Sequence, residues 1–314
     1  MSDLTSASAD ETYSYLGPAG TFTEAALKQA PEARGKVWRP VNNVLEALGD
    51  VVDGRSVGAM IAIENSIEGG VTASQDALAA IPGLRIRGEY TVQVQFSLAV
   101  RPGIGLDDIT TVAAHPVAYG QCRRWLQANI PGHRHITAAS NIASAGALFD
   151  PLVGADAAIT PPNIRDRIAV DVLAENIQDN QDTRTRFVLV GVTKEIPPRT
   201  GADKTSLIVE LPEERPGALL EMLEQFATRG INMSMITSRP IPERIGEYRF
   251  VIDIDGHLHD ARVRDALLGL RRYSRNVLFL GSYPRADHAA VHVPERSTDA
   301  QYELAGEWLA SLEA

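Results

Sequence analysis

Short apolar runs alternate with segments of helical periodicity over roughly the first two thirds of the chain. This alternation is typical of βα units that build a mainly parallel sheet. The predicted strands are "YSYL" (13–16), "VGAMIAI" (57–63), "VAAH" (112–115), "HITAA" (135–139) and "AAIT" (157–160). The clearest helix is predicted at 43–53, where Asn43 can cap the first turn and apolar residues recur on one face.

Two longer runs predict that this α/β domain has two lobes. The alternating run "YTVQVQFSLAV" (90–100) is too long for one strand in a compact unit, so it is predicted to pass from one lobe into another. "RFVLVGV" (186–192) is predicted to pass back. Two crossings give a hinged domain with a cleft, a common setting for small-ligand sites.

The pattern changes after a Pro-, Gly- and charge-rich stretch, 194–204, which is predicted to be a linker. Beyond it the order is strand, helix, strand, strand, helix, strand, which predicts a small βαββαβ domain. Its first helix begins with Pro216 and ends at Gly230, as helices commonly do. The predicted divisions are a flexible N-terminus at 1–10, an α/β domain at 11–193, the linker, a βαββαβ domain at 205–283 and a C-terminal tail at 284–314.

Composition limits the classes of function. Hydrophobic residues make up 44% of the 314 and charged residues 22%, as in soluble globular proteins. A net charge of -10 argues against nucleic acid as a partner. The opening residues lack the features of a secretory signal, no apolar segment reaches membrane-spanning length, and Cys122 is the single cysteine. A reducing cytoplasm is therefore the expected location.

Polar residues and glycines follow every predicted strand of the first domain. The segments concerned are "GPAGTFTE", "ENSIEGG", "PVAYGQC", "SNIAS" and "PPN". In an open parallel sheet, ligands bind beyond the carboxyl ends of the strands. Structural explanations also exist, because Thr21 fits a capping box with Glu24, and Ser140 or Asn141 can cap the next helix. Gln121 could be either a ligand-binding residue or a structural one.

Two segments point more specifically to a site. Glu64, Asn65 and Ser66 follow a strand that is predicted to be buried on both faces, and the glycines after them allow close backbone approach. Arg186, at the start of the returning strand, offers a planar fork suited to a carboxylate. The alternative is a surface arginine paired with an aspartate. The predicted ligand is a small carboxylic acid; no metal-binding or cofactor-binding motif is present in the sequence.

These segments resemble the successive motifs of a known family. "YLGPAGTFTEAA", "AIENSIEGGV", "HPVAYGQC" and "NIQDNQDTRTRFVLV" look like the motifs of prephenate dehydratase, in the family's order. "PGALLEMLEQFATRGINMSMITSRP" resembles the ACT regulatory domain that follows in those enzymes. The resemblance runs from about Tyr13 to Tyr283. It implies a two-lobed, periplasmic-binding-protein-like catalytic domain followed by an ACT domain.

The resemblance implies decarboxylating elimination of water from prephenate, giving phenylpyruvate for phenylalanine synthesis. It also implies feedback inhibition by phenylalanine, no cofactor, and a homodimer or homotetramer joined in part through ACT domains. One alternative is arogenate dehydratase, which performs the same elimination on the amino analogue. Another is a non-catalytic amino-acid sensor.

The family's site residues carry over to matching positions. Thr185 is expected to donate a hydrogen bond to the leaving hydroxyl, while Arg186 anchors the pyruvyl carboxylate. The expected catalytic residues are Thr185, Arg186, Ser66, Asn65 and Glu64, and the expected substrate-binding residues are Thr21, Gln121, Ser140, Asn141 and Phe187. Phenylalanine is expected at a subunit interface formed by Gly217, Ala218, Leu219, Leu220, Asn232, Ser238 and Arg239.

Two positions depart from the family's motifs. The family usually has asparagine where this chain has Thr183, two positions before the Thr-Arg-Phe motif. It commonly has glutamate where this chain has Thr237, before Ser238, Arg239 and Pro240. The second departure removes a carboxylate near the expected effector pocket, so effector preference or affinity is expected to differ.

Overall fold

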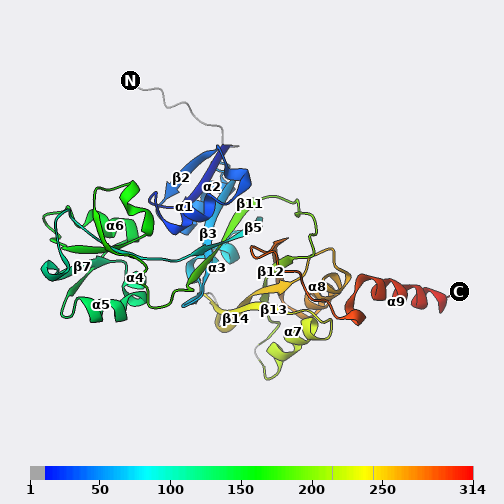
Figure 1. The fold of residues 1–314 in the computed structure, drawn as a ribbon. Helices are drawn as coiled ribbons and strands as arrows, with labels where there is room; N and C mark the ends of the chain where they lie inside the picture. Colours follow the sequence, from blue (N-terminus) through cyan, green and yellow to red (C-terminus); the bar gives the residue numbers. More distant parts are fainter. Residues whose placement is uncertain (1–10, 214, 243, 314) are drawn as a thin grey trace.

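The protein forms three units in a row, two lobes and a C-terminal domain (Figure 1). The computed structural model describes residues 11–213, 215–242 and 244–313. The N-terminus predicted to be flexible, 1–10, lies outside the described residues. Within those residues, no helix is long and apolar enough to cross a membrane.

The first lobe is built on one sheet with the strand order β2-β1-β3-β11-β5, to which β4 adds at β3. Its strands are β1 (Thr12–Leu16), β2 (Val37–Val41), β3 (Gly58–Asn65), β4 (Gly69–Gly70), β5 (Leu84–Gln93) and β11 (Arg184–Val192). Its helices are α1 (Phe22–Leu27), α2 (Val44–Val52) and α3 (Thr72–Ala80). The predicted helix at 43–53 is confirmed as α2, and the Asn43 side chain accepts a hydrogen bond from Glu46 N at 2.9 Å.

The second lobe has a five-stranded sheet with the order β10-β6-β9-β7-β8. Its strands are β6 (Ser97–Val100), β7 (Thr111–Ala114), β8 (Arg134–Thr137), β9 (Ala157–Thr160) and β10 (Asp171–Ala174). Its helices are α4 (Pro116–Gln121), α5 (Arg123–Asn129) and α6 (Asn141–Gly146). Short 3-10 helices lie at Pro31–Ala33, Leu106–Asp108, Pro162–Asp166 and Glu295–Ser297.

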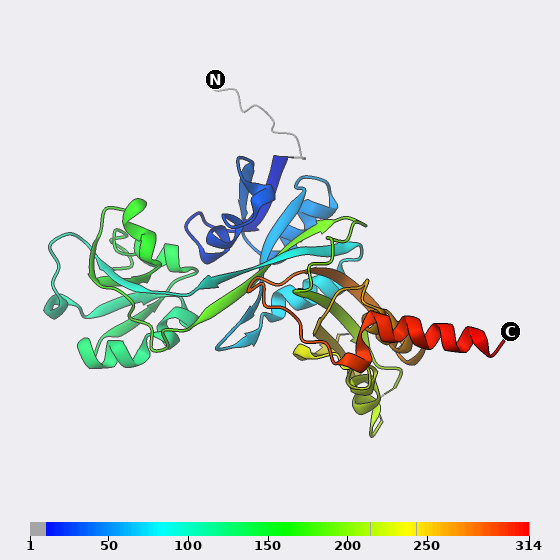
Figure 2. The ribbon, with the colours of Figure 1, turned by 45° about the vertical axis from the view of Figure 1, so that its right-hand side comes forward.

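The chain crosses between the lobes twice, as the sequence predicted (Figure 2). The segment from β5 to β6 leads out of the first lobe, and the segment ending in β11 leads back. The sheets are mixed rather than mainly parallel, because β11 pairs antiparallel with both β3 and β5. β11 runs antiparallel to these two strands because the chain enters the first lobe from the second at this point.

The C-terminal domain has the predicted βαββαβ order, so the predicted fold class is confirmed. Its sheet has the order β13-β14-β12-β15. The elements are β12 (Asp203–Glu210), α7 (Ala218–Ala227), β13 (Met233–Ile241), β14 (Arg244–Asp255), α8 (Ala261–Tyr273) and β15 (Asn276–Pro284). β12 begins inside the stretch predicted to be a linker.

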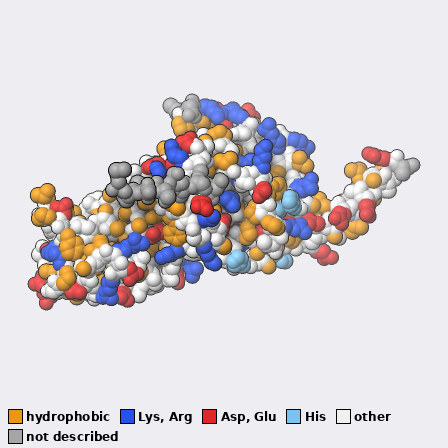
Figure 3. Space-filling view, turned by 90° about the horizontal axis from the view of Figure 1, so that it is seen from above, with side chains coloured by type: hydrophobic (Ala, Val, Ile, Leu, Met, Phe, Trp, Pro, Cys, Tyr) orange, Lys and Arg blue, Asp and Glu red, His pale blue; other side chains and the backbone are white. Residues whose placement is uncertain are grey.

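The tail ends in α9 (Asp299–Ser311), which extends away from the C-terminal domain (Figures 1 and 2). Its large apolar side chains remain exposed: Leu304, Trp308, Leu309 and, just beyond it, Leu312. In the space-filling view, hydrophobic and acidic side chains alternate along this projection (Figure 3). The helix therefore contributes no core to the domain.

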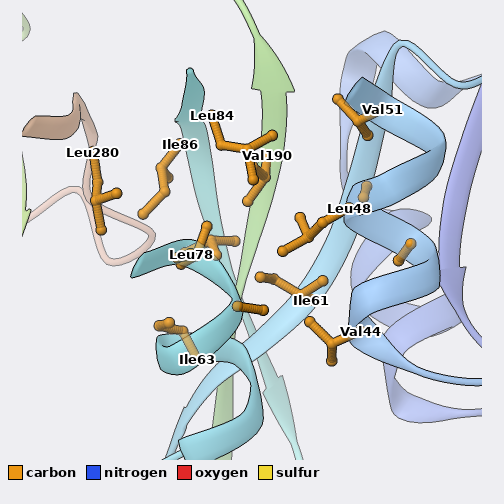
Figure 4. Close-up of a cluster of buried hydrophobic side chains, with 14 of the residues drawn as sticks. Val44, Leu48, Val51, Ile61, Ile63, Leu78, Leu84, Ile86, Val190 and Leu280 are labelled. Carbon is orange, nitrogen blue, oxygen red and sulfur yellow. The ribbon is translucent and has the colours of Figure 1, made fainter. Parts of the chain in front are cut away.

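The first lobe and the C-terminal domain share a hydrophobic core. Leu280 of β15 lies beside Ile86 of β5 in a cluster that also contains Leu78 and Leu84 (Figure 4). Burying these side chains together fixes the C-terminal domain against β5, the strand next to β11. At the tightest point, a Cβ on Gly281 would lie 2.4 Å from the carbonyl oxygen of Ile86.

Replacing Gly281 is expected to loosen this domain contact. Gly281 has a φ of +145°, which side-chain-bearing residues rarely adopt, and the obstructing Ile86 oxygen belongs to the backbone. Gly281→Ala is expected to cost about 2 kcal/mol or more and to lower the melting temperature by several degrees. Gly306→Ala in α9, where a Cβ meets open space, is the control. Equal melting temperatures for both variants would contradict the tight domain contact.

Candidate active site

A cavity of about 380 Å³ lies between the two lobes. The first lobe contributes the loop after β1 and the end of β3, the second contributes α4 and the start of α6, and the crossing segments contribute Val94, Phe96, Thr185 and Phe187. The lining residues that were predicted from the sequence are Thr21, Asn65, Gln121, Ser140, Asn141, Thr185 and Phe187. The structure therefore brings most of the predicted residues into one cleft.

A hydrogen bond between Asn65 and Thr185 orients the threonine hydroxyl. Asn65 Nδ2 donates to Thr185 Oγ1 at 3.0 Å, and Asn65 Oδ1 accepts from Ile67 N at 2.9 Å. The second bond fixes which end of the amide faces Thr185. Because Thr185 Oγ1 is an acceptor here, its own proton is free to be donated into the cleft.

Two polar atoms in the cleft lack partners among the described residues. They are Gln121 Oε1 and Asn141 Oδ1, both buried. A buried acceptor without a hydrogen bond is costly, so each atom favours a ligand or water that can donate to it. These two groups and Thr185 come from different elements of the chain and border the same cavity.

The capping roles predicted as alternatives are also present. Thr21 Oγ1 accepts from Glu24 N at 3.4 Å at the start of α1, and Ser140 Oγ accepts from Ala143 N at 3.0 Å at the start of α6. Both residues still border the cavity. Capping and site lining are therefore compatible at these positions, because each helix begins at the cleft.

Glu24 also links the two lobes beside the cleft. Its Oε2 pairs with Arg167 Nη2 of the second lobe at 2.7 Å and accepts from Gly20 N at 2.7 Å. A Cβ on Gly20 would approach both Arg167 and Ile142 to 2.8 Å, so glycine permits this close contact. The pair holds the "GPAG" loop against the second lobe.

The rest of the lining is apolar or neutral. Phe22 and Phe96 pack edge to face, with their ring centroids 5.8 Å apart. Burial lowers the pKa of His115 below its ordinary value, which keeps the imidazole neutral at pH 7. The lining residues include neither lysine nor arginine. No group of three or more His, Cys, Asp or Glu suited to a metal ion occurs in the described part of the chain.

The predicted placement of Arg186 in the cleft is wrong. Thr185 and Phe187 border the cavity, so Arg186 points to the opposite face of β11, because successive side chains of a strand alternate. There its guanidinium bonds Glu64 at 3.0 Å, Glu89 at 3.0 Å and Asp253 of the C-terminal domain. Its side chain is only 10% exposed. Arg186 therefore lies at a domain junction rather than at a ligand site.

Glu64 and Ser66 also lie outside the cavity lining, contrary to prediction. Glu64 pairs with Arg186, and Ser66 exchanges hydrogen bonds with the backbone of Arg184 at 3.0 Å in each direction. Both residues hold the end of β3 against β11. Their contribution to the cleft is to fix Asn65, which lies between them.

Other lining residues were not predicted to be part of the site. They include Asn42, His115, Phe22, Phe96 and Thr23. His115 could have been predicted as a site residue, because it lies at the end of a predicted strand. The sequence gives no such indication for Asn42, because Asn42 reaches the cleft only through the parallel pairing of β2 with β1. Thr183, the departure from the family motif, is fully buried, and its hydroxyl donates to Asn180 O at 2.9 Å.

In the C-terminal domain, the predicted effector residues fall into three places. Ala218 and Leu219 border a cavity of about 170 Å³ at the start of α7, where Gly217 has a φ of +88°. Asn232 lies beyond the other end of α7 and donates to Asp255 at 2.7 Å. Arg239 instead pairs with Asp76 of α3 at 2.8 Å, so it lies at the domain junction. Leu220 and Ser238 are exposed.

Fold and cleft together define the class: a two-lobed α/β domain built to enclose a small ligand, joined to a βαββαβ domain of the ACT type. A family model described as prephenate dehydratase matches residues 13–195, and one described as ACT domain matches 205–272. The chain belongs to the prephenate dehydratase family and carries an ACT domain.

Relatives and solved structures agree with this assignment. A protein of Amycolatopsis methanolica named prephenate dehydratase is 40% identical over 300 residues, which are 95% of this chain and 97% of the relative. The crystal structure of prephenate dehydratase from Arthrobacter aurescens in complex with L-Phe is 47% identical with a TM-score of 0.91, covering 96% of this chain and 99% of that one. A structure of GqqA, described as a novel type of quorum quenching acylase, is 27% identical with a TM-score of 0.75, covering 87% and 98%.

The new position of Arg186 predicts a stability effect that a ligand-binding arginine would not have. Arg186→Met leaves the buried carboxylates of Glu89 and Asp253 without a shared cation, which is expected to cost about 3–5 kcal/mol. The measurement is urea-induced unfolding without ligand. Arg184→Met, on the same strand but exposed, is the control and is expected to change stability little. Comparable stability of the two variants would rule out the junction role.

Proposed function

We propose that this chain converts prephenate into phenylpyruvate, carbon dioxide and water. The proposal rests on membership of the family together with one observation, the Thr185 hydroxyl oriented by Asn65 towards the interlobe cleft. A non-catalytic sensor needs no free hydroxyl proton at that place. Arogenate, the amino analogue, is the alternative substrate.

The reaction breaks two bonds of the ring: the carbon–carbon bond to the carboxylate and the carbon–oxygen bond to the hydroxyl. The electrons of the bond to the ring carboxylate flow into the ring as carbon dioxide leaves, and the hydroxyl departs with its bonding pair and gains a proton to become water. The ring becomes aromatic. A hydrogen bond from Thr185 to the departing oxygen stabilises the charge that develops there, and such donors contribute about 10²- to 10³-fold.

A cleft without lysine or arginine suits the decarboxylation. A strong ion pair to the ring carboxylate would hold the charge that must move into the ring, and would stabilise the ground state more than the transition state. The pyruvyl carboxylate survives the reaction, so it can be bound by neutral donors. We place it near the Ser140 hydroxyl and the first turn of α6, because the first N–H groups of a helix have no intrahelical partner.

Phenylalanine is the proposed inhibitor, bound between subunits of a homodimer or homotetramer. Gly217, Ala218 and Leu219 at the start of α7 form one wall, and Asn232 of a second subunit forms the other. The assignment of the two walls to different subunits is supported by the length of α7, ten residues or about 15 Å. This length keeps Asn232 away from Gly217, Ala218 and Leu219 of the same subunit. The related Arthrobacter aurescens structure contains L-Phe.

We place the reaction in the cytoplasm.

The direct test of the activity compares substrates. Purified protein mixed with prephenate is expected to produce the ultraviolet absorbance of phenylpyruvate, with a higher kcat/KM than for phenylalanine formation from arogenate. Preference for arogenate would assign the alternative reaction. The absence of turnover with either substrate would leave the sensor as the better account.

Thr185 and Asn65 variants test the hydroxyl. Thr185→Ala is expected to lower kcat by about 10²-fold or more with a smaller change in KM, while Thr185→Ser keeps a donor and loses less. Asn65→Asp is expected to resemble Thr185→Ala, because a carboxylate would accept the threonine proton. Steady-state kinetics measures all three. Wild-type kcat in Thr185→Ala would exclude the proposed donor.

A further inference from the structure

Arg186 connects the catalytic domain with the ACT domain through one guanidinium group. Nε bonds Glu64 of β3, Nη1 bonds Glu89 of β5, and Nη2 bonds both Asp253 of β14 and Met235 Sδ of β13. The first two partners belong to the catalytic domain and the last two to the ACT domain. All three nitrogens of this rigid planar fork are therefore engaged, each in a different direction.

The charges around Arg186 come from both domains. Lys204 of the ACT domain bonds Glu89 at 3.0 Å, and Ala286 N donates to the same carboxylate at 2.9 Å. Burial alone would raise the pKa of Glu89, but the positive charges of Lys204 and Arg186 outweigh it and hold the pKa below its ordinary value. Asp253 is in turn held by the Ser206 hydroxyl. Glu89 and Asp253 are buried and Arg186 is largely buried, so the position of each charged group depends on that of its partners.

The catalytic side of this network is directly adjacent to the oriented hydroxyl. In the antiparallel pairing of β11 with β3, Thr185 is opposite Asn65 and Arg186 is opposite Glu64. Side chains of the first pair meet in the cleft, and those of the second pair meet at the junction. A register shift follows immediately, between Arg186 and Phe187. Such irregularities commonly redirect side chains next to active sites.

We propose that Arg186 is a positioning residue through which the ACT domain controls the orientation of Thr185 and Asn65. This inference rests on the proposed function, because it explains how an effector on the ACT domain reaches the cleft. A shift of β14 moves the Asp253 carboxylate, and the rigid guanidinium cannot keep its other partners at bonding distance. The Arg186–Glu64 pair then changes, and with it the neighbouring Thr185–Asn65 pair.

The geometry makes this coupling sensitive to small movements. The bonds of Arg186 to Glu64 and Glu89 are 3.0 Å long, slightly longer than is typical of charge-assisted hydrogen bonds. A displacement of roughly 1 Å would break a bond of this kind. An effector that favours one position of the ACT domain therefore favours one state of the cleft.

Asp253→Asn separates coupling from binding. The amide keeps the shape and can still bond both Arg186 and Ser206, but it removes the charge that holds Arg186. Calorimetry is expected to give a phenylalanine Kd within about twofold of wild type. Under saturating phenylalanine, the residual fraction of each protein's own uninhibited rate is expected to be roughly fivefold higher in the variant, at the lower end of typical couplings.

The matched control is Asp203→Asn. Asp203 is similarly buried in the same sheet, but its partners Thr200 and Gly201 lie in the adjoining loop and not in the catalytic domain. This variant is expected to be inhibited like wild type. Wild-type inhibition of Asp253→Asn, with phenylalanine bound, would overturn the proposal. Failure of wild type to bind phenylalanine would instead refute the proposed effector.

A second variant tests positioning without phenylalanine. Arg186→Lys keeps the charge but supplies one ammonium in place of a three-way fork, so the Glu64 contact is expected to be lost. In folded protein, checked by its thermal transition, kcat is expected to fall roughly tenfold while KM changes less than twofold, as for an interaction realised in the transition state. Wild-type kcat in Arg186→Lys would contradict a positioning role whatever the effector is.

Discussion

The antiparallel pairing of β11 with β3 is the constraint on which the site depends. It joins the strand that returns from the second lobe to the strand that ends in Asn65. One pair of facing residues, Thr185 and Asn65, supplies the oriented hydroxyl, and the next pair, Arg186 and Glu64, supplies the contact with the ACT domain. Because adjacent side chains of a strand point to opposite faces, one short segment serves both the cleft and the domain junction.

The cleft itself is neutral, which distinguishes it from most sites for anionic ligands. Its cations are directed elsewhere: Arg167 pairs with Glu24 between the lobes, and Arg186 pairs with carboxylates at the junction. In the proposed reaction, binding by amides, hydroxyls and helix starts leaves the ring carboxylate free to lose its charge. Because the lining has neither lysine nor arginine, the oriented hydroxyl of Thr185 is the group proposed to stabilise the departing oxygen.

The sequence predicted the architecture because its signals are local: period-two runs at the crossings, a cap at Asn43, and the βαββαβ order. Site residues in the segments just after predicted strands, such as Asn65 and Ser140, were predicted for the same reason. Arg186 was misplaced although the alternation of Thr185, Arg186 and Phe187 assigns it to the other face. Its partners were not predictable from the sequence, since Glu89 and Asp253 lie 97 and 67 residues away. Glu89 reaches Arg186 through the pairing of β11 with β5, and Asp253 does so only when the two domains pack.

The central claim is that substrate binds between the lobes with its departing hydroxyl at Thr185. A crystal structure of the Thr185→Ala protein soaked with prephenate tests it most directly, since slow turnover should leave the substrate intact. The account predicts electron density for the ring in the interlobe cavity, with its hydroxyl directed at residue 185 and near the Asn65 amide. Density for the ring at any other place, with the cavity empty, would contradict it.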